Sequence, residues 1–428
     1  MATRERVVRA INRVVVPAYL AMLRARRDPA GLLMSPRVVD DPYGVYDRLR
    51  QRGPVVRTAI GGVVVTGHGE AASVLRDPQY VVSPRRAKRF KPPPVPAPDS
   101  PEALQPDDRS ILLSMDPPDH TRVRQFVSRA FTPRAIEELV AVTEEVVDRL
   151  VGGLAERTGF EVMSELAYPV PVAVICAILG VPTSEGSRVR RWGYDIAPTL
   201  DFTPSPKLVA RAEASGAEGG EYFLDLVARR RRDPGEDLLS ILVTAQAEGA
   251  ELSDQELLGT CVLILLAGFV TTVNLIGSGL AALLEHPAEL ERLRDDPALI
   301  PNAVDEMLRY DSPVQATGRI AAKATTVGDA RVEAGEQVIV LLGAANRDPQ
   351  VFPEPARLVV DRPNANHHVS FGGGAHHCLG AALARMEGRV VFEALVKRFS
   401  RISLAAPPVR RPIFNLRGFE TLRVDVRR

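Results

Sequence analysis

The 428-residue chain has few cysteines and almost no net charge, and each shortage excludes a class of protein. Its three cysteines, Cys176, Cys261 and Cys378, are too few and too scattered for a disulfide framework, which fits a reducing cytoplasm. A formal net charge of +1 gives no electrostatic reason to expect nucleic acid or an anionic membrane as the main partner. We therefore expect a cytoplasmic protein that does not bind nucleic acid.

The N-terminal segment lacks the features of a signal peptide or a membrane anchor. Residues 1–35 form an amphipathic, arginine-rich extension without a small-residue cleavage site, and their best apolar run is too short to span a bilayer. A helix lying on a membrane surface remains an alternative. No membrane span is predicted here.

Helical patterns dominate the rest of the chain. Helices are predicted over 41–52, 69–75, 137–154 and 161–179, whereas prolines break the pattern between 182 and 224. Strand-like runs occur at 54–58, 63–66, 324–328, 331–332, 337–341 and 422–426, the first two as a hairpin. The segment 77–110 is rich in proline. Neither flanking part of the chain could form a hydrophobic core of its own, so we interpret 77–110 as a surface loop and not as a linker between domains. The economical prediction is one mainly α-helical domain over 1–428.

A long apolar helix is predicted over 253–286. Ser253 and Glu256 form a capping box at its start, and Pro287 stops it. No charged residue lies between Leu257 and Leu284, a pattern that a transmembrane span also shows. Its threonines and glycines and its acidic flanks without aromatic belts favour a helix buried in a helical core.

The most informative stretch is 371–380, Phe-Gly-Gly-Gly-Ala-His-His-Cys-Leu-Gly. Three consecutive glycines carry no side-chain bulk, so the backbone can lie flat against a large planar group. Apolar residues recur at helical spacing after Cys378, which places its sulfur just ahead of a helix N-terminus, where N–H groups stabilise a thiolate. Such a thiolate suits an axial iron ligand.

The cysteine alone leaves two other interpretations. Cys378 could be a small buried hydrophobe after a glycine turn. Zinc is the second alternative because His376, His377 and Cys378 are adjacent, although adjacent side chains diverge and the chain has no C-x-x-C pair. The whole stretch, however, resembles the haem-binding loop of the cytochrome P-450 family at every fixed position. These positions are Phe371, Gly372, Gly374, His376, Cys378 and Gly380.

The resemblance covers nearly the whole chain and implies a fold and a chemistry. The fold would be the family's triangular α-helical prism with small β-sheets and a long central helix over the haem. Cys378 would be the metal ligand of haem b (iron protoporphyrin IX). The reaction would use dioxygen and two electrons from NAD(P)H, delivered by a ferredoxin reductase and a separate ferredoxin.

The central helix contains a stretch similar to the family's oxygen-activating segment, which reads Ala-Gly, any residue, an acid, then threonine. Ala267, Gly268 and Thr271 match, and Thr271 would help deliver protons. Val270 stands where the family has the acid, which puts ordinary proton delivery in doubt. Asn274, three residues after Thr271, could hold a substitute water network.

Charged residues match the positions that hold the haem and support its loop. The resemblance assigns the haem propionates to His120, Arg124, Arg319 and His376. Glu306 and Arg309 resemble a buried Glu-x-x-Arg pair, which Arg362, in preference to Arg357, would complete. Arg122 and Arg129 are predicted to face solvent and to dock an acidic ferredoxin.

The predicted pocket is mostly apolar, so the expected substrate is an apolar small molecule, hydroxylated or epoxidised in bacterial secondary metabolism. It would arrive either free or tethered to a carrier protein. By family analogy the wall includes the 77–110 loop, the 192–210 segment, Leu266, Ala267, Val270, Val314, Ala316, Thr317, Phe414 and Leu416. Alternatives are desaturation, cyclisation or radical coupling, use of peroxide, and a non-catalytic haem-binding recruitment module.

Overall fold

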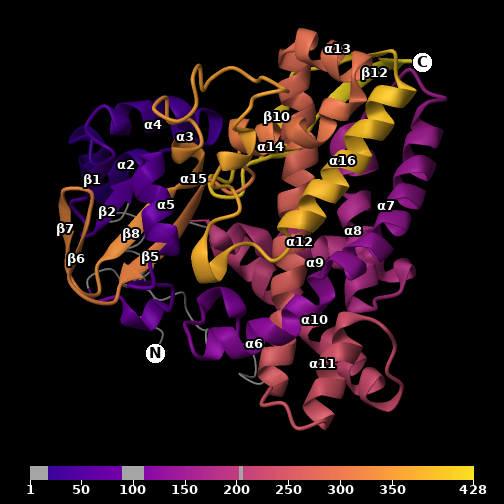
Figure 1. Cartoon of the computed structure of the whole chain (residues 1–428), viewed down its shortest axis with the longest axis horizontal. Coiled ribbons are helices and arrows are strands. Elements are labelled where there is room, and N and C mark those ends of the chain that lie inside the picture. The colour runs from indigo at the N-terminus through magenta and orange to yellow at the C-terminus, as the bar shows by residue number, and fades with distance from the viewer. Residues whose placement is uncertain (1–17, 89–109, 202–205) are drawn as a thin grey trace.

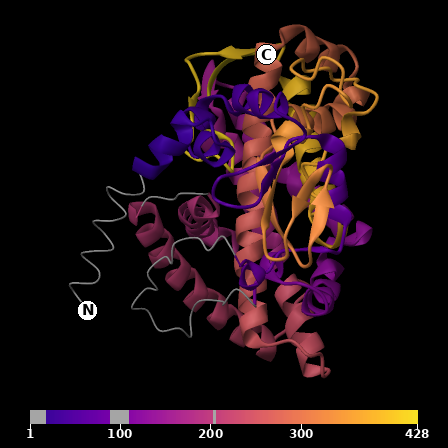
Figure 2. The same ribbon diagram turned by 90° about the vertical axis from the view of Figure 1, so that its left-hand side faces the viewer.

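The computed structural model describes residues 18–88, 110–201 and 206–428. In these ranges a larger helical part and a smaller part built around a sheet flank one long helix, α12 (Asp254–Glu285), which runs the height of the molecule (Figure 1). The view turned by 90° again shows α12 along the centre (Figure 2). Much of the 1–35 and 77–110 segments, and residues 202–205 of the predicted pocket wall, lie outside the described residues.

Helix α12 begins at a capping box, where the sequence predicts one. The Ser253 hydroxyl accepts the Glu256 backbone N–H at 3.2 Å, and the Glu256 carboxylate accepts the Ser253 backbone N–H at 2.7 Å. The 32 residues of α12 span roughly 50 Å at 1.5 Å per residue. By length and composition α12 could cross a membrane, but 67% of its most apolar window is buried inside the fold. It is a core helix here.

The smaller part contains a five-stranded sheet of order β1-β2-β8-β5-β3. Its strands are β1 (Val55–Arg57), β2 (Val63–Val65), β8 (Gln337–Leu341), β5 (Ala316–Ala321) and β3 (Tyr80–Val81). Strands β1 and β2 form the predicted antiparallel hairpin, and β2 pairs with β8 in parallel. Strand β5 is not predicted from the sequence because Gly318 and Arg319 interrupt its apolar alternation. It pairs antiparallel with β8 and thereby fixes the position of Arg319.

Short elements surround this sheet. They are α2 (Pro29–Leu33), α3 (Arg37–Asp40), α4 (Pro42–Arg50), α5 (His68–Arg76), α15 (Leu342–Ala345), β6 (Thr325–Val327) and β7 (Ala330–Val332). Strands β6 and β7 form a separate hairpin.

One large apolar cluster holds the helical part together and includes residues of α7, α8, α12, α14 and α16. The helices of this part are α6 (Asp119–Val127), α7 (Pro133–Leu154), α8 (Pro169–Leu179), α9 (Gly186–Ile196), α10 (Pro206–Arg232), α11 (Leu238–Ala247), α13 (Pro287–Asp295), α14 (Ile300–Tyr310) and α16 (Ala381–Arg398). Packing α12 against α8, α14 and α16 buries its apolar surface on several sides, which explains why the helix lacks charged residues.

Two stretches differ from the sequence prediction. A single helix is predicted over 161–179, but β4 (Gly159–Glu161) and a π-helical turn at 163–167 precede α8. Residues 182–224 are predicted to be broken, but α10 continues for 27 residues from Pro206. Proline is tolerated at the first position of a helix, so Pro206 starts α10 and does not interrupt it.

The chain ends in small sheets that close the helical part. Strand β12 (Arg423–Arg427), near the predicted strand at 422–426, pairs antiparallel with β4 and with β9 (Arg401–Leu404). Strands β10 (Val409–Arg410) and β11 (Phe419–Thr421) form a hairpin beside them.

Candidate haem-binding site

The loop 371–380 is held in a backbone conformation that requires glycine. Gly372 and Gly374 have positive φ angles of 68° and 64°, which L side chains rarely adopt. A Cβ on Gly374 would also lie 2.6 Å from the Leu75 carbonyl oxygen of α5. The Cys378 backbone N–H donates to the Phe371 carbonyl at 2.9 Å and closes the loop. These features fix the backbone of the loop at Cys378.

Cys378 differs from the other two cysteines in its exposure. Cys176 and Cys261 are buried, and burial raises the pKa of Cys176 to about 11, so both behave as inert core residues. The Cys378 side chain is exposed, just before Gly380, which caps α16. Although its surface is open, surrounding protein still raises the pKa of the Cys378 thiol, and the Gly380 N–H, Arg124 and Arg385 oppose this effect.

The raised pKa of Cys378 differs from the sequence-based expectation that the N-terminus of the following helix favours the thiolate. The Gly380 N–H group lowers the pKa of the thiol as expected. In the protein without a bound metal, however, the cost of burying a negative charge raises the pKa by more. A bound metal cation reverses that balance because it coordinates the thiolate and displaces the proton.

The four residues assigned to the propionates converge from three elements. The rings of His120 (α6) and His376 (the loop) lie 4.1 Å apart between centroids. Burial and, to a smaller extent, the nearby His120, Arg319 and Arg124 together lower the pKa of His376 to about 3. Arg124 donates to the His377 carbonyl at 2.6 Å. The result is a compact group of cations and donors beside the loop.

This group fits an anionic ligand. Arg319 is buried, and its guanidinium donates to the Thr317 hydroxyl at 3.2 Å and to the Gly318 carbonyl at 2.9 Å. Neither of these partners carries a charge that would neutralise the cation. The His120 Nε2 atom is buried and has no partner among the described residues. A ligand with two carboxylates would satisfy these groups, and haem carries two propionates. The donor set therefore fits haem, with Cys378 as the available thiolate ligand.

The stretch 266–274 of α12 presents its residues to different surroundings. Ala267 is exposed, and the Thr271 hydroxyl donates to the Ala267 carbonyl at 2.6 Å, one turn earlier. Gly268 faces elsewhere: a Cβ there would collide with the Ile175 side chain of α8. Its small size thus serves helix packing here, and its role in the oxygen-activating segment stays a prediction.

Val270 and Asn274 are both fully buried. Val270 belongs to the apolar core, and its place in the substrate wall stays a prediction. The Asn274 amide lies against Gly418, and neither of its polar atoms has a partner among the described residues. The two residues are four apart on one helix, so a carboxylate at position 270 would be within reach of this amide.

The other residues of the predicted pocket wall also differ in their exposure. Leu266, Val314 and Thr317 are partly exposed, whereas Ala316, Phe414 and Leu416 are buried. Phe414 packs edge-on against Tyr46, with 6.4 Å between ring centroids, in the core of the smaller part. Whether Phe414, Ala316 and Leu416 contact a substrate thus stays a prediction.

Glu306, Arg309 and Arg362 form one buried ionic network behind the loop. Glu306 accepts from Arg309 at 2.7 and 2.8 Å and from Arg362 at 3.1 Å. Arg357 contributes only its carbonyl, which accepts from Arg309 at 3.1 Å. Arg309 also donates to the Asn346 carbonyl at 3.1 Å, and the Asn346 side chain accepts the Val369 N–H at 2.7 Å. The network thus reaches the start of the loop.

One predicted surface residue is engaged inside the protein. Arg122 is not free in solvent: it donates to the Glu256 carboxylate at 2.6 Å and to the Glu251 carbonyl, which ties α6 to the start of α12. Arg129 is exposed, with its guanidinium 5.4 Å from the Phe126 ring centroid. The prediction that both arginines face solvent thus holds for Arg129 and not for Arg122, and docking of a ferredoxin stays a prediction.

A second polar group behind the loop, formed by Asp305, His368 and Arg385, is not predicted from the sequence. Neither is Glu387 of α16, a fully buried carboxyl whose Oε2 has no partner among the described residues. A charged residue inside the apolar period of a helix is the one signal that could have indicated Glu387. The partners of Asp305 lie far away in the sequence and give no local signal.

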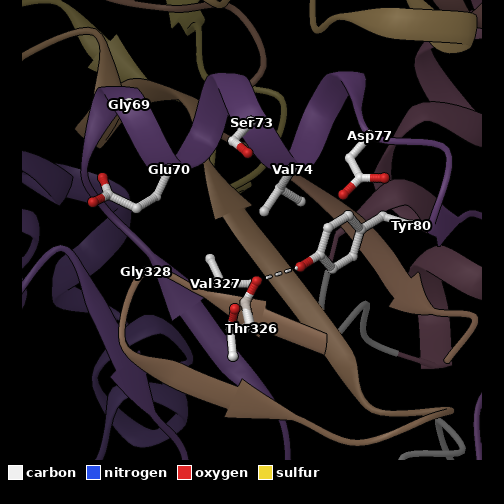
Figure 3. Close-up of a pocket in the computed structure, with 9 residues that line it drawn as sticks. All are labelled: Gly69, Glu70, Ser73, Val74, Asp77, Tyr80, Thr326, Val327 and Gly328. Atoms are coloured by element: carbon white, nitrogen blue, oxygen red, sulfur yellow. Dashed lines mark hydrogen bonds between the residues drawn. The ribbon is translucent and has the colours of Figure 1, made fainter. Parts of the chain in front are cut away.

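A separate small pocket lies between α5 and the β6–β7 hairpin (Figure 3). Its cavity volume is about 270 Å³, and it is lined by Glu70 and Ser73 of α5, by Asp77 just after that helix, and by Tyr80. The Tyr80 hydroxyl donates to the Thr326 carbonyl at 3.1 Å. The residues predicted to hold the haem do not line this pocket, but Asp77 and Tyr80 belong to the 77–110 segment that is predicted in the substrate wall.

A zinc site finds no support in the part of the chain that the structure describes, where no three His, Cys, Asp or Glu side chains could share a metal ion. Comparison with known proteins points to the haem proteins instead. The sequence model of the family described as Cytochrome P450 matches residues 225–411. The biotin biosynthesis cytochrome P450 of Bacillus subtilis is 36% identical over 397 residues, which cover 91% of this chain and 97% of that protein.

Two further comparisons extend over nearly the whole chain. Cytochrome P450 monooxygenase PikC of Streptomyces venezuelae is 38% identical over 424 residues, or 94% of this chain and 98% of that protein. The solved structure of P450BioI in complex with hexadec-9Z-enoic acid ligated acyl carrier protein matches with a TM-score of 0.82 at 35% identity, covering 91% of this chain and 100% of that one. The predicted fold class is confirmed, and the chain belongs to the cytochrome P450 family of oxidoreductases.

Proposed function

We propose that the protein is a haem-thiolate monooxygenase that oxidises an apolar small molecule, by hydroxylation or epoxidation, in bacterial secondary metabolism. The convergence of His120, Arg124, Arg319 and His376 beside the loop that carries an exposed Cys378 is the observation that carries this proposal. When bound, haem supplies the oxygen and one-electron chemistry. The protein's part is to hold the group, position the substrate and control protons.

Each residue has a distinct role in this proposal. Cys378 binds the iron, and the two arginines and two histidines bind the propionates. Phe371, Gly372 and Gly380 shape the loop. Thr271 holds a proton on its hydroxyl, and the bond from that hydroxyl to the Ala267 carbonyl fixes its orientation on the open face of α12.

We propose electron delivery from NAD(P)H through a reductase and a separate ferredoxin, with Arg129 in the docking surface. Complementary charge would make this association weaken as salt rises. A cytoplasmic location is consistent with three unpaired cysteines.

The substrate is either free or tethered to a carrier protein. The carrier-bound form is supported by the similarity to P450BioI, which was solved with an acyl carrier protein that bears a fatty acid. The partly exposed Leu266, Val314 and Thr317 would contact the substrate.

The test is an optical titration of the ferric, haem-loaded protein with natural-product scaffolds, offered both free and as thioesters of carrier protein. A substrate that displaces water from the iron should shift the spectrum from low to high spin, and product analysis then identifies the reaction. If no scaffold gives this shift and no electron donor gives an oxidised product, the recruitment module replaces the enzyme as the best interpretation.

Thr271→Ala is expected to lower product formation about tenfold or more and to raise peroxide release, because the variant lacks the hydroxyl that holds the proton. The measurement is product and peroxide formed per NAD(P)H consumed, with a substrate found by the titration. Thr271→Ser is the matched control, since it keeps the hydroxyl. An alanine variant as well coupled as the wild type would contradict the proton-holding role and would favour use of peroxide.

Val270→Glu is expected to raise the ratio of product to peroxide severalfold, because the carboxylate supplies the acid that the family has here and gives the Asn274 amide a partner. Val270→Gln introduces a side chain of the same size without an acid and should not raise the ratio of product to peroxide. Equal ratios in the two variants would show that the acid has no role at this position.

An atypical outcome is the second candidate. The buried Val270 and the Asn274 amide, which has no partner among the described residues, favour it because position 270 lacks the usual acid. Desaturation, cyclisation or radical coupling of the substrate would then appear in the product analysis in place of an added oxygen atom.

A further inference from the structure

Asp305 of α14 binds two side chains behind the haem-binding loop. Arg385 of α16 donates through Nε to Asp305 Oδ1 at 2.7 Å, and His368 Nε2 lies 3.2 Å from the same oxygen. The Ser370 N–H donates to His368 Nδ1 at 3.2 Å, so a neutral His368 carries its proton on Nε2 and donates it to Asp305. Burial works to raise the pKa of Asp305, but these two bonds outweigh it and hold the pKa below its usual value. Asp305 is therefore an anionic carboxylate paired with a cation.

The ion pair contacts the haem-binding loop through Arg385. The Arg385 guanidinium lies 4.6 Å from the centroid of the Phe371 ring, at the start of the loop. Phe371 in turn accepts the Cys378 backbone N–H through its carbonyl. The loop thus connects Arg385 to the sulfur through a single residue.

The surroundings strengthen the electrostatic effect of the pair. The side chains of Asp305 and Arg385 are 14% and 37% exposed, so their charges are only partly screened by solvent.

We propose that the Asp305–Arg385 ion pair sets the reduction potential of the haem-loaded protein. Arg385 favours the ferrous state, and Asp305 offsets that cation. One-electron reduction adds one negative charge to the centre without forming or breaking a bond, so a nearby cation stabilises the reduced state and a nearby anion destabilises it. The inference rests on the proposed role of Cys378 as the iron ligand.

The test is a spectroscopic redox titration of haem-loaded variants with dithionite and mediator dyes. Arg385→Gln should make the ferrous state less favourable, and Asp305→Asn should make it more favourable. We expect a three- to tenfold change in the ferric–ferrous equilibrium constant in each case, where tenfold corresponds to about 59 mV for one electron. The double variant should return close to the wild-type potential, because both charges are removed.

Two controls separate a charge effect from structural damage. Arg389→Gln removes a cation one turn along α16, whose ion pair at 3.0 Å is with Glu393, and should leave the potential nearly unchanged. Arg385→Lys keeps the charge without the planar guanidinium and should stay near the wild type. Structural damage to the loop would instead shift the reduction potentials of Arg385→Gln and Asp305→Asn in the same direction.

Same-sign shifts, or shifts no larger than that of Arg389→Gln, would overturn the inference. A wild-type ferrous carbon monoxide complex without the red-shifted Soret band of thiolate ligation would instead overturn the proposed ligand. The two failures are therefore distinguishable.

Discussion

Glu306→Ala is expected to lower the free energy of unfolding by about 3–5 kcal/mol and to yield protein with little haem. The Glu306 and Arg309 side chains are both 0% exposed, and Arg362 also bonds to this carboxylate. The Val359 backbone N–H donates to it at 2.9 Å as well. Removing the carboxylate leaves two buried cations without their counter-charge, and the segment that leads to the haem loop loses its support.

Chemical unfolding and the ratio of haem to protein after purification measure this effect. Glu354→Ala is the control, because Glu354 is 74% exposed and its ion pair with Arg357 is 3.6 Å long. That variant should change stability by no more than about 1 kcal/mol. A haem-replete Glu306→Ala protein of wild-type stability would refute the structural role of the network.

Glu387→Gln is expected to stabilise the protein above pH 8 and to have little effect near pH 5. Burial raises the pKa of Glu387 to about 8 in the folded protein, against an ordinary value of 4.5. Between these values the folded chain keeps a proton that the unfolded chain has lost, so stability falls as pH rises. The cost is absent below 4.5 and complete above about 8, where it reaches about 3–5 kcal/mol at 1.36 kcal/mol per pKa unit.

Unfolding midpoints of the haem-loaded wild type and variant, measured from pH 5 to pH 9, test this expectation. The two curves should diverge as pH rises, with the glutamine variant the more stable. Glu393→Gln on the same helix removes a carboxylate that is partly exposed and paired with Arg389, and should give a curve parallel to the wild type. A parallel curve for Glu387→Gln would show that this carboxyl ionises freely in the folded protein.

The features that the sequence predicts well are those with a local pattern. The capping box at Ser253 and the uncharged run after Leu257 predict α12 because both signals act within a single helix. The glycines and Cys378 of the loop likewise form one contiguous motif, and the positive φ angles of Gly372 and Gly374 show why glycine is needed there.

The features that escape prediction depend on contacts between distant segments. Strand β5 forms because β8 supplies a partner, although its own sequence interrupts the alternation. Which face of α12 each residue occupies also depends on packing, so the assignments of Gly268 and Val270 needed the positions of α8 and the apolar core. The same holds for Asp305, whose partners His368 and Arg385 are brought to it only by the fold.

The central claim is that Cys378 provides the thiolate that binds iron. The measurement that tests it most directly is the absorption spectrum of the ferrous carbon monoxide complex of the wild type and of Cys378→Ser. We predict the red-shifted Soret band of thiolate ligation in the wild type and its loss in the serine variant. A serine variant that keeps this band, or a wild type that lacks it, would contradict the account.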